Sequence, residues 1–416
     1  MDHRFELPGS YRKWTLGLIV VGVLALLYGF IMFHPFAQAG HGENVNSTRF
    51  WAVLLQNSVY WLLTVNAVMF FICVTTMAMG GWQIAFRRVS EAISSVVPIL
   101  GIITFIILMA IVWGGRSDIY PWVDSAYVSQ DKILNGKKGF LSPVFFTIWS
   151  VIAIALWSLL GRKMRSLSLQ SDKGPMNYET AKKWTWDNTV WASLFTVTFG
   201  LTVASTVPWL WLMSIDAHWY STMYSWYTFA STFVSGLSLL ALFIIYLKNR
   251  GQLEYVTDEH LHDVGKFMFA FSVFWTYLWF SQYMLIWYSN QPEETRYFID
   301  RIGTADKAGP YRGIFFFNLI VNFLCPLLIL MKKSTKRNWT IMTFMAVLII
   351  FGHWIDFYQM VMPGALHEHA ELMPFEFGIA CLFIGIIMWG AGRYLSSHSL
   401  LAKNHPFLKE SMIHHT

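Results

Sequence analysis

The sequence predicts an all-α polytopic membrane protein with about ten transmembrane helices, and three observations support this fold class. Charged residues make up 13% of the 416 residues, which is about half the share in ordinary soluble domains. Hydrophobic residues reach 55%, and the mean hydropathy is +0.45. Apolar runs of roughly 20 residues, the length that crosses a bilayer as a helix, recur along the whole chain. We therefore treat residues 1–416 as a single integral membrane domain and expect no soluble domain.

The apolar runs locate the expected helices in chain order. The first run follows basic N-terminal residues and has no small-residue cleavage site, so we expect a retained helix rather than a signal peptide. The expected spans cover about residues 14–34, 51–81, 93–113, 143–161, 190–214, 219–247, 265–289, 312–331, 339–362 and 374–395. Two longer loops, 115–142 and 290–311, contain glycine, proline and mixed charges. They could dock a partner or simply connect helices.

The positions of the basic residues orient these spans. If the N-terminus is cytoplasmic, 21 of the 30 lysines and arginines lie on the cytoplasmic side and the other nine lie opposite. The positive-inside rule therefore predicts a multi-pass protein with both termini in the cytoplasm. We interpret the net charge of +6 as this orientation signal, so we expect lipids as neighbours and no nucleic-acid partner.

The sequence offers no obvious redox centre. The three cysteines all fall within apolar runs, where they are expected to be small buried hydrophobes. No C-x-x-C-H motif is present, so we expect no covalently bound haem. The histidines are not placed to ligate paired b-type haems across the membrane. We predict no metal site and no catalytic residue in this chain, and we expect any electron acceptor in another subunit.

Ionisable residues within spans are candidates for function, because burying them in a membrane costs several kcal/mol. His353 and Asp356 in the ninth span are three residues apart and should share one helix face. Counting back from Pro363 places Asp356 about 10 Å below the helix end. Glu376 begins the tenth span two residues after Pro374. We expect the two carboxylates and the imidazole to converge near the non-cytoplasmic side.

This expected group has two interpretations. A histidine beside a carboxylate can pass protons near neutral pH, and it can hydrogen-bond a quinone carbonyl or a quinol hydroxyl. Alternatively, His353 and Asp356 form a buried ion pair that fixes helix packing. Gln282 and Tyr283 in the seventh span add neutral polar groups at a depth similar to that of Asp356, although such residues also serve as hydrogen bonds between helices.

Polar residues near the two membrane surfaces extend the set of candidates. Asp216 and His218 lie in the turn before the sixth span and could form a proton exit or the rim of a quinone pocket, or Asp216 could cap a helix. His262 and Asp263 lie at the opposite side, before the seventh span. They could gather protons for a half-channel, or they could belong to a solvated interfacial loop.

Four segments of this sequence resemble a known family. They are VPWLWLMSIDAHWYST at 207–222, HDVGK at 262–266, FWTYLWFSQYMLIWY at 274–288 and PEE at 292–294. Together they resemble the F-type membrane subunit of bacterial alternative complex III, a quinol:cytochrome c oxidoreductase, within the polysulfide-reductase-like membrane family. The resemblance implies two four-helix bundles, formed by spans two to five (about 51–214) and six to nine (about 219–362), with spans one and ten flanking them.

The resemblance also implies a place in electron transport. It implies location in the bacterial cytoplasmic (inner) membrane and a respiratory-chain complex that contains an iron–sulfur subunit, c-type haem subunits and a paralogous membrane subunit, with cytochrome c or a terminal oxidase as acceptor. Haem and iron–sulfur clusters would belong to these partners, whereas quinol or quinone could bind this chain. In family terms, His353 and Asp356 would correspond to a quinone or proton-exit group, with Glu376 nearby.

The sequence therefore leads us to expect a membrane subunit of a quinol-oxidising respiratory complex that supports quinone binding, proton translocation or both. Two alternatives remain open. A self-contained ion or solute transporter would have discontinuous helices and inverted repeats. A structural scaffold would only anchor peripheral redox subunits, and His353 and Asp356 would then be packing residues.

Overall fold

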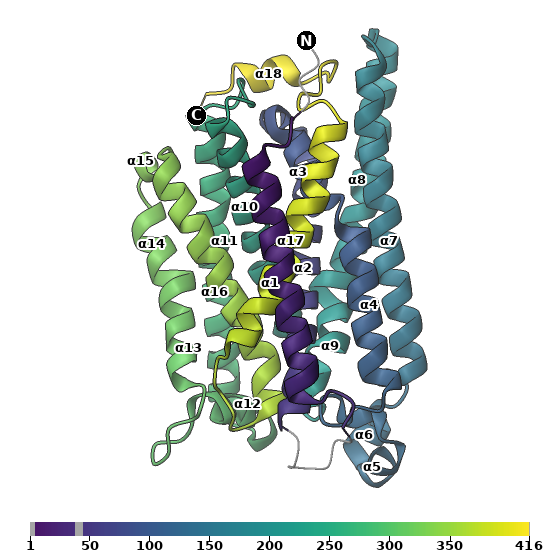
Figure 1. Cartoon of the computed structure of the whole chain (residues 1–416), viewed down its shortest axis with the longest axis vertical. Coiled ribbons are helices and arrows are strands. Elements are labelled where there is room, and N and C mark those ends of the chain that lie inside the picture. The colour runs from purple at the N-terminus through teal and green to yellow at the C-terminus, as the bar shows by residue number, and fades with distance from the viewer. Residues whose placement is uncertain (1–4, 38–44, 416) are drawn as a thin grey trace.

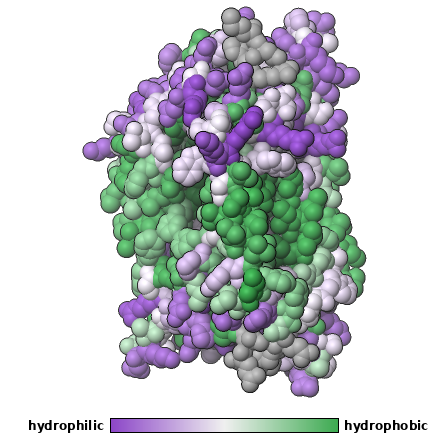
Figure 2. Space-filling view, in the orientation of Figure 1, coloured by the Kyte–Doolittle hydropathy of each residue, from purple (hydrophilic) through white to green (hydrophobic). Residues whose placement is uncertain are grey.

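The computed structural model describes residues 5–37 and 45–415, and within these ranges helices are the regular secondary structure and no strand occurs. The long helices stand side by side in an elongated bundle (Figure 1). Figure 2 shows hydrophobic residues in a band around the middle of the visible face and hydrophilic residues at both ends. This pattern matches a lipid-facing belt between two wet surfaces. The prediction of an all-α polytopic membrane protein is confirmed.

Nine helical segments in the described part of the chain are long and apolar enough to cross a membrane. They are α1 (Gly9–Phe33), α2 (Val45–Met77), η1–α3–α4 (Gly81–Trp113), α7–η3 (Pro143–Lys173), α8–η4–α9 (Tyr178–Trp211), α10 (Met223–Asn249), α13–η6–α14 (Arg312–Leu330), α16 (Trp339–Leu366) and α17 (Pro374–Ser397). The remaining expected span lies within α11 (Asp258–Ser289), which packs against α10 and α14. Its tryptophans, tyrosines and serines make it less apolar than the other nine.

Several helices are longer than their apolar runs. α7 (Pro143–Gln170) and α8 (Tyr178–Leu201) extend well beyond the expected spans and leave only a short connection between them. The two longer expected loops contain the short helices η2 (Pro121–Val123), α5 (Ser125–Gln130), α6 (Lys132–Lys137) and α12 (Pro292–Ile302). Counting apolar residues detects the part of a helix that crosses lipid, whereas polar helical ends continue into the wet regions.

The two ends of the bundle differ. α15 (Lys333–Lys336), α18 (Leu408–Met412) and the beginning of α1 lie at one end, which we call the terminal end (Figure 1). α5, α6 and α12 lie at the opposite end, which we call the loop end. The first described residues and the last helix thus lie at the same end of the bundle.

α2 and α10 form the centre of the packing. α2 packs against α4 and α8, both of which contact α7, while α10 packs against α11 and α16. α2 also packs against α10 and α16, so one hydrophobic core runs through both groups of helices. α1 pairs with α17 along its length on the flank. The division into two four-helix bundles stays a prediction.

Two membrane helices contain a π-helical turn, η4 (Thr202–Thr206) and η6 (Ile320–Leu324). Each is followed by a proline, Pro208 or Pro326. Proline has no N–H and clashes with the carbonyl four residues earlier, so a wider turn relieves the backbone at that point. Asn318 lies just before the turn at η6 and Asn322 lies within it. Asn318 belongs to the site described below.

Candidate functional site

Asp356 in α16 is the centre of a buried polar cluster. Its side chain is fully buried and accepts hydrogen bonds from three other helices. Tyr227 of α10 donates to Oδ1, Asn318 of α13 donates to the same oxygen at 2.8 Å, and Trp275 of α11 donates to Oδ2 at 3.0 Å. All three donors are neutral groups. The carboxylate is therefore stabilised by hydrogen bonds rather than by a bonded arginine or lysine.

His353 lies on the same helix face as Asp356, as their spacing predicts. Its Nδ1 is 3.8 Å from Asp356 Oδ2 and 3.0 Å from the hydroxyl of Ser231 on α10. The imidazole packs edge-on against Trp275, with ring centroids 5.3 Å apart. Nε2 is buried and has no hydrogen-bond partner in the described part of the chain. His353 Nδ1 thus lies within hydrogen-bond distance of the Ser231 hydroxyl and within ion-pair distance of the Asp356 carboxylate.

The depth of Asp356 differs from the expectation. α16 continues through Pro363 to Leu366, so ten residues, or about 15 Å at 1.5 Å per residue, separate Asp356 from the loop end of its helix. The count from Pro363 was wrong because this proline lies inside the last turns. Its missing N–H would leave the carbonyl of Gln359, four residues earlier, without a partner.

Arg301 of α12 supplies that partner. Its Nε and Nη2 donate to the Gln359 carbonyl at 3.2 and 3.1 Å, and its Nη1 donates to the Tyr297 carbonyl at 2.7 Å. The guanidinium lies over the Tyr297 ring, 3.4 Å from the centroid, and 3.8 Å from Asp216. Arg301 is 1% exposed. Sequence reasoning placed Arg301 only in a surface loop, although the unmatched carbonyl created by Pro363 was a detectable signal.

A cavity of about 20 Å³ lies between this arginine and the Asp356 cluster. Its polar wall consists of Tyr227, Asn318, Gln282, Gln359 and Arg301. Gln359 is 5% exposed, and both atoms of its amide are without a hydrogen-bond partner among the described residues. A space of this size with such a lining fits one water molecule.

Gln282 and Tyr283 have separate positions. Gln282 is buried and lines this cavity, so it lies close to the Asp356 cluster. Tyr283 is half-buried and packs edge-on against Phe298 of α12, with centroids 5.1 Å apart.

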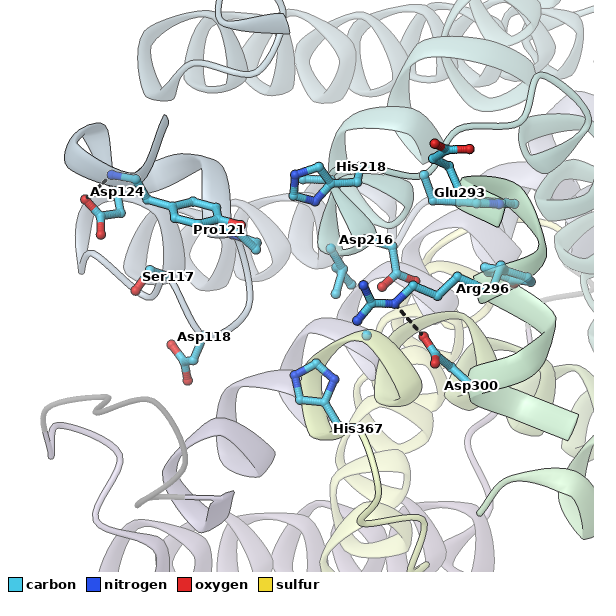
Figure 3. Close-up of a pocket in the computed structure, with 16 residues that line it drawn as sticks. Ser117, Asp118, Pro121, Asp124, Asp216, His218, Glu293, Arg296, Asp300 and His367 are labelled. Carbon is cyan, nitrogen blue, oxygen red and sulfur yellow. Dashed lines mark hydrogen bonds and ion pairs between the residues drawn. The ribbon is translucent and has the colours of Figure 1, made fainter. Parts of the chain in front are cut away.

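Beyond Arg301, a pocket of about 330 Å³ opens at the loop end (Figure 3). Asp216, His218 and His367 lie on one side of it, and Asp118 and Asp124 lie on the other. Asp216 is 30% exposed at its side chain, and burial raises its pKa above the ordinary value of 3.8 against the opposing effect of Arg301. Asp216 does not cap α10, which begins at Met223. It instead lies between the open pocket and the buried arginine.

His218 lines the pocket but pairs with Asp131 rather than with Asp216. Its Nε2 lies 2.5 Å from Asp131 Oδ2, and its side chain is 45% exposed. A partly exposed pair of this kind adds little stability. His218 is therefore a surface group at the pocket rim.

Glu376 does not join His353 and Asp356. Its Oε1 forms an ion pair with Arg49 of α2 at 2.9 Å, and its Oε2 accepts from the backbone N–H of Met373 at 2.9 Å. Arg49 also donates to the carbonyl of Glu371 at 2.6 Å. The expected convergence of three groups is corrected to two, because α17 packs on α1 and α2 and so turns Glu376 toward Arg49.

His262 and Asp263 lie at the terminal end of α11. Asp263 is 5% exposed and contacts Lys266 at 2.7 Å, His414 at 2.8 Å and His262 at 3.7 Å. These residues are thus packed beneath the C-terminal segment rather than in a solvated loop. The structure does not bring them into contact with the Asp356 cluster.

Within residues 5–37 and 45–415, no group of three or more histidine, cysteine, aspartate or glutamate side chains is placed to hold a metal ion.

Comparisons with known proteins leave the family open. No protein-family model matches the chain, and no curated protein matches it.

Proposed function

We propose that this chain is a membrane subunit of a quinol-oxidising respiratory electron-transfer complex, in which Asp356 and His353 exchange protons with the loop end. The observation that carries this proposal is the buried Asp356 carboxylate, held by neutral donors from three helices beside a water-sized cavity. A buried carboxylate is costly unless it is hydrogen-bonded. Its neutral surroundings let it gain or lose a proton without breaking a fixed ion pair.

A series of polar groups supports a route from Asp356 toward the loop end. Tyr227 and Asn318 both donate to Asp356 and both line the small cavity. Arg301 lines the same cavity and reaches Asp216 at 3.8 Å, and Asp216 lines the open pocket. One water molecule beside Gln359 would connect the inner and outer parts of this route.

The size of the cavity favours proton exchange over quinone binding at Asp356. A space of about 20 Å³ accommodates water, whereas sites for ring-sized ligands are typically about 300–1,000 Å³. The larger loop-end pocket has several carboxylates in its wall, including Asp118 and Asp300, and thus suits protons and water better than an apolar ring. Quinol oxidation releases protons, so a route of this kind serves that chemistry.

The wider assembly rests on the four resembling segments and on the charge distribution. We propose a location in the bacterial cytoplasmic membrane with the basic terminal end toward the cytoplasm. Partner subunits would carry the iron–sulfur clusters and c-type haems. Electrons would then leave through those partners while protons leave through the loop end.

The test replaces Asp356 with asparagine in the assembled complex. We expect D356N to reduce quinol-coupled proton release at least about a hundredfold, the lower end of general acid–base effects, while the subunits remain assembled. D131N is the matched control, because Asp131 is also at the loop end but lines neither the small cavity nor the open pocket. Unchanged proton release in D356N would overturn the proposal and favour a scaffold. Solute uptake by the isolated chain in liposomes would favour a self-contained transporter.

A further inference from the structure

A second buried polar cavity lies at the terminal end of the bundle. It has a volume of about 20 Å³ and lies among the end of α2, η1 (Gly81–Phe86), α3 (Arg87–Ser94), α8 and the C-terminal segment. Its polar lining consists of the side chains of Gln83, Arg87, Asn188 and His405, each at most 6% exposed, and the partly exposed hydroxyls of Thr76 and Thr185. No aspartate or glutamate is among the described lining residues. This cavity is remote from Asp356, at the other end of the molecule.

The charges beside this cavity do not balance. Glu91 accepts from Arg87 Nε at 3.0 Å and from Arg88 Nη1 at 2.9 Å, and Asp172 accepts from Arg88 Nη2 at 2.6 Å. The third guanidinium, Arg165, donates to a backbone carbonyl and is also buried. Within the described ranges, three buried guanidinium groups thus face the buried Glu91 and the partly exposed Asp172, and a buried uncompensated charge is strongly unfavourable. A small anion would restore neutrality.

Gln83 and His405 can each donate a hydrogen bond at this cavity. Gln83 is 0% exposed, and both of its amide atoms lack a partner in the described ranges. The backbone N–H of Phe407 donates to His405 Nδ1 at 3.2 Å, which leaves the ring proton on Nε2. Burial, together with Arg87 and Arg88, holds the pKa of His405 well below its ordinary value of 6.5, so the ring is a neutral donor.

Asn188 helps to orient the cation. Its Nδ2 donates to the Trp184 carbonyl at 2.9 Å, so its Oδ1 faces Arg87 Nη2 at 3.4 Å. The amide thus presents its acceptor to the guanidinium and holds Arg87 at the cavity wall.

We propose that this cavity binds a monoatomic anion of the chloride type, held by Arg87, Gln83 and His405. A space of about 20 Å³ suits an ion not much larger than water, and a water molecule there would leave the charge unbalanced. Glu410 lies against Gly81 near this cavity, but it is exposed, so solvent screens its charge.

The anion would join the C-terminal segment to the bundle. His405 comes from that segment, whereas Gln83 and Arg87 come from η1 and α3. Ser411 continues the same attachment, because its hydroxyl donates to the Trp82 carbonyl at 2.7 Å and accepts from the Ala85 N–H at 3.0 Å. Anion binding should therefore stabilise the folded chain.

The test measures thermal unfolding of the full chain in detergent micelles, with chloride or bromide exchanged for gluconate at constant ionic strength. We expect a saturable rise in Tm with either halide and none with gluconate, because a ligand that binds only the folded state raises stability. Q83M and H405F should lose this rise. Q359M is the matched control, because it alters an unpartnered buried glutamine in the other cavity, and it should keep the rise.

A bromide-soaked crystal gives an independent measurement on the unaltered chain. We expect an anomalous peak between Arg87, Gln83 and His405. An equal Tm in chloride and gluconate, or retention of the halide effect in Q83M, would overturn the proposal. The absence of a bromide peak at this cavity would overturn it even if both variants failed to fold.

Discussion

The contact between Arg301 and the Gln359 carbonyl provides a quantitative prediction. Pro363 cannot donate to that carbonyl, and Arg301 donates to it through two nitrogens at 3.2 and 3.1 Å. R301M would leave the buried carbonyl without a partner, which costs about 1–3 kcal/mol. It would also remove the stacking on Tyr297, worth about 0.5–2 kcal/mol. We therefore expect R301M to lower the free energy of unfolding by roughly 2–5 kcal/mol.

A second substitution isolates the carbonyl contribution. P363A restores a backbone N–H that can bond the Gln359 carbonyl within the helix. In the P363A background, R301M should therefore cost about 1 kcal/mol less than it costs alone, which is a measurable coupling in a double-mutant cycle.

The assay is equilibrium unfolding by denaturant in detergent micelles, with R296M as the control. Arg296 is also in α12, but its side chain is 79% exposed and its ion pair with Asp300 is long, at 3.6 Å. We expect R296M to change the free energy of unfolding by less than about 1 kcal/mol. Additive effects of R301M and P363A would refute the role assigned to Arg301.

Two further predictions concern the proposed proton route. Burial raises the pKa of Asp216 above 3.8, so above about pH 4 the folded state binds more protons than the unfolded state. The free energy of unfolding should therefore fall as the pH rises, until Asp216 ionises in the folded protein. D216N should flatten this fall in Tm against pH, and an unchanged slope would contradict the assignment. Y227F removes a hydrogen bond to Asp356, a loss worth about 1.5–3 kcal/mol, and should slow quinol-coupled proton release about tenfold or more. Y224F is the control and should have little effect, because Tyr224 is a buried tyrosine of the same helix that does not donate to Asp356 in the described structure. Equal rates in Y227F and wild type would argue against this route.

The fold and the pair of His353 and Asp356 could be predicted from the sequence for physical reasons. Apolar length identifies helices that cross lipid, and the spacing of His353 and Asp356 sets a shared face within one helix. α11 shows the limit of apolar counting, because its tryptophans, tyrosines and serines lower the hydropathy of a helix that still packs along the bundle. Counting apolar residues also misses the polar ends of α7 and α8, which continue as helix beyond the lipid.

The partners of Asp356 could not be predicted because they depend on how helices face one another. Tyr227, Trp275 and Asn318 are 129, 81 and 38 residues away from it in the chain. Depth alone suggested Glu376, but the packing of α17 directs that side chain to Arg49. Sequence distance and membrane depth thus restrict the candidates, whereas helix rotation selects among them.

The central claim is that Asp356 changes its protonation state while the complex oxidises quinol. Infrared difference spectroscopy of the complex, recorded in H2O and in D2O, measures this most directly through the C=O stretch of a protonated carboxyl group. We predict a deuterium-sensitive carboxyl band in wild type and in D131N that is absent from D356N. An identical band in D356N, or no carboxyl band in wild type during turnover, would contradict the account.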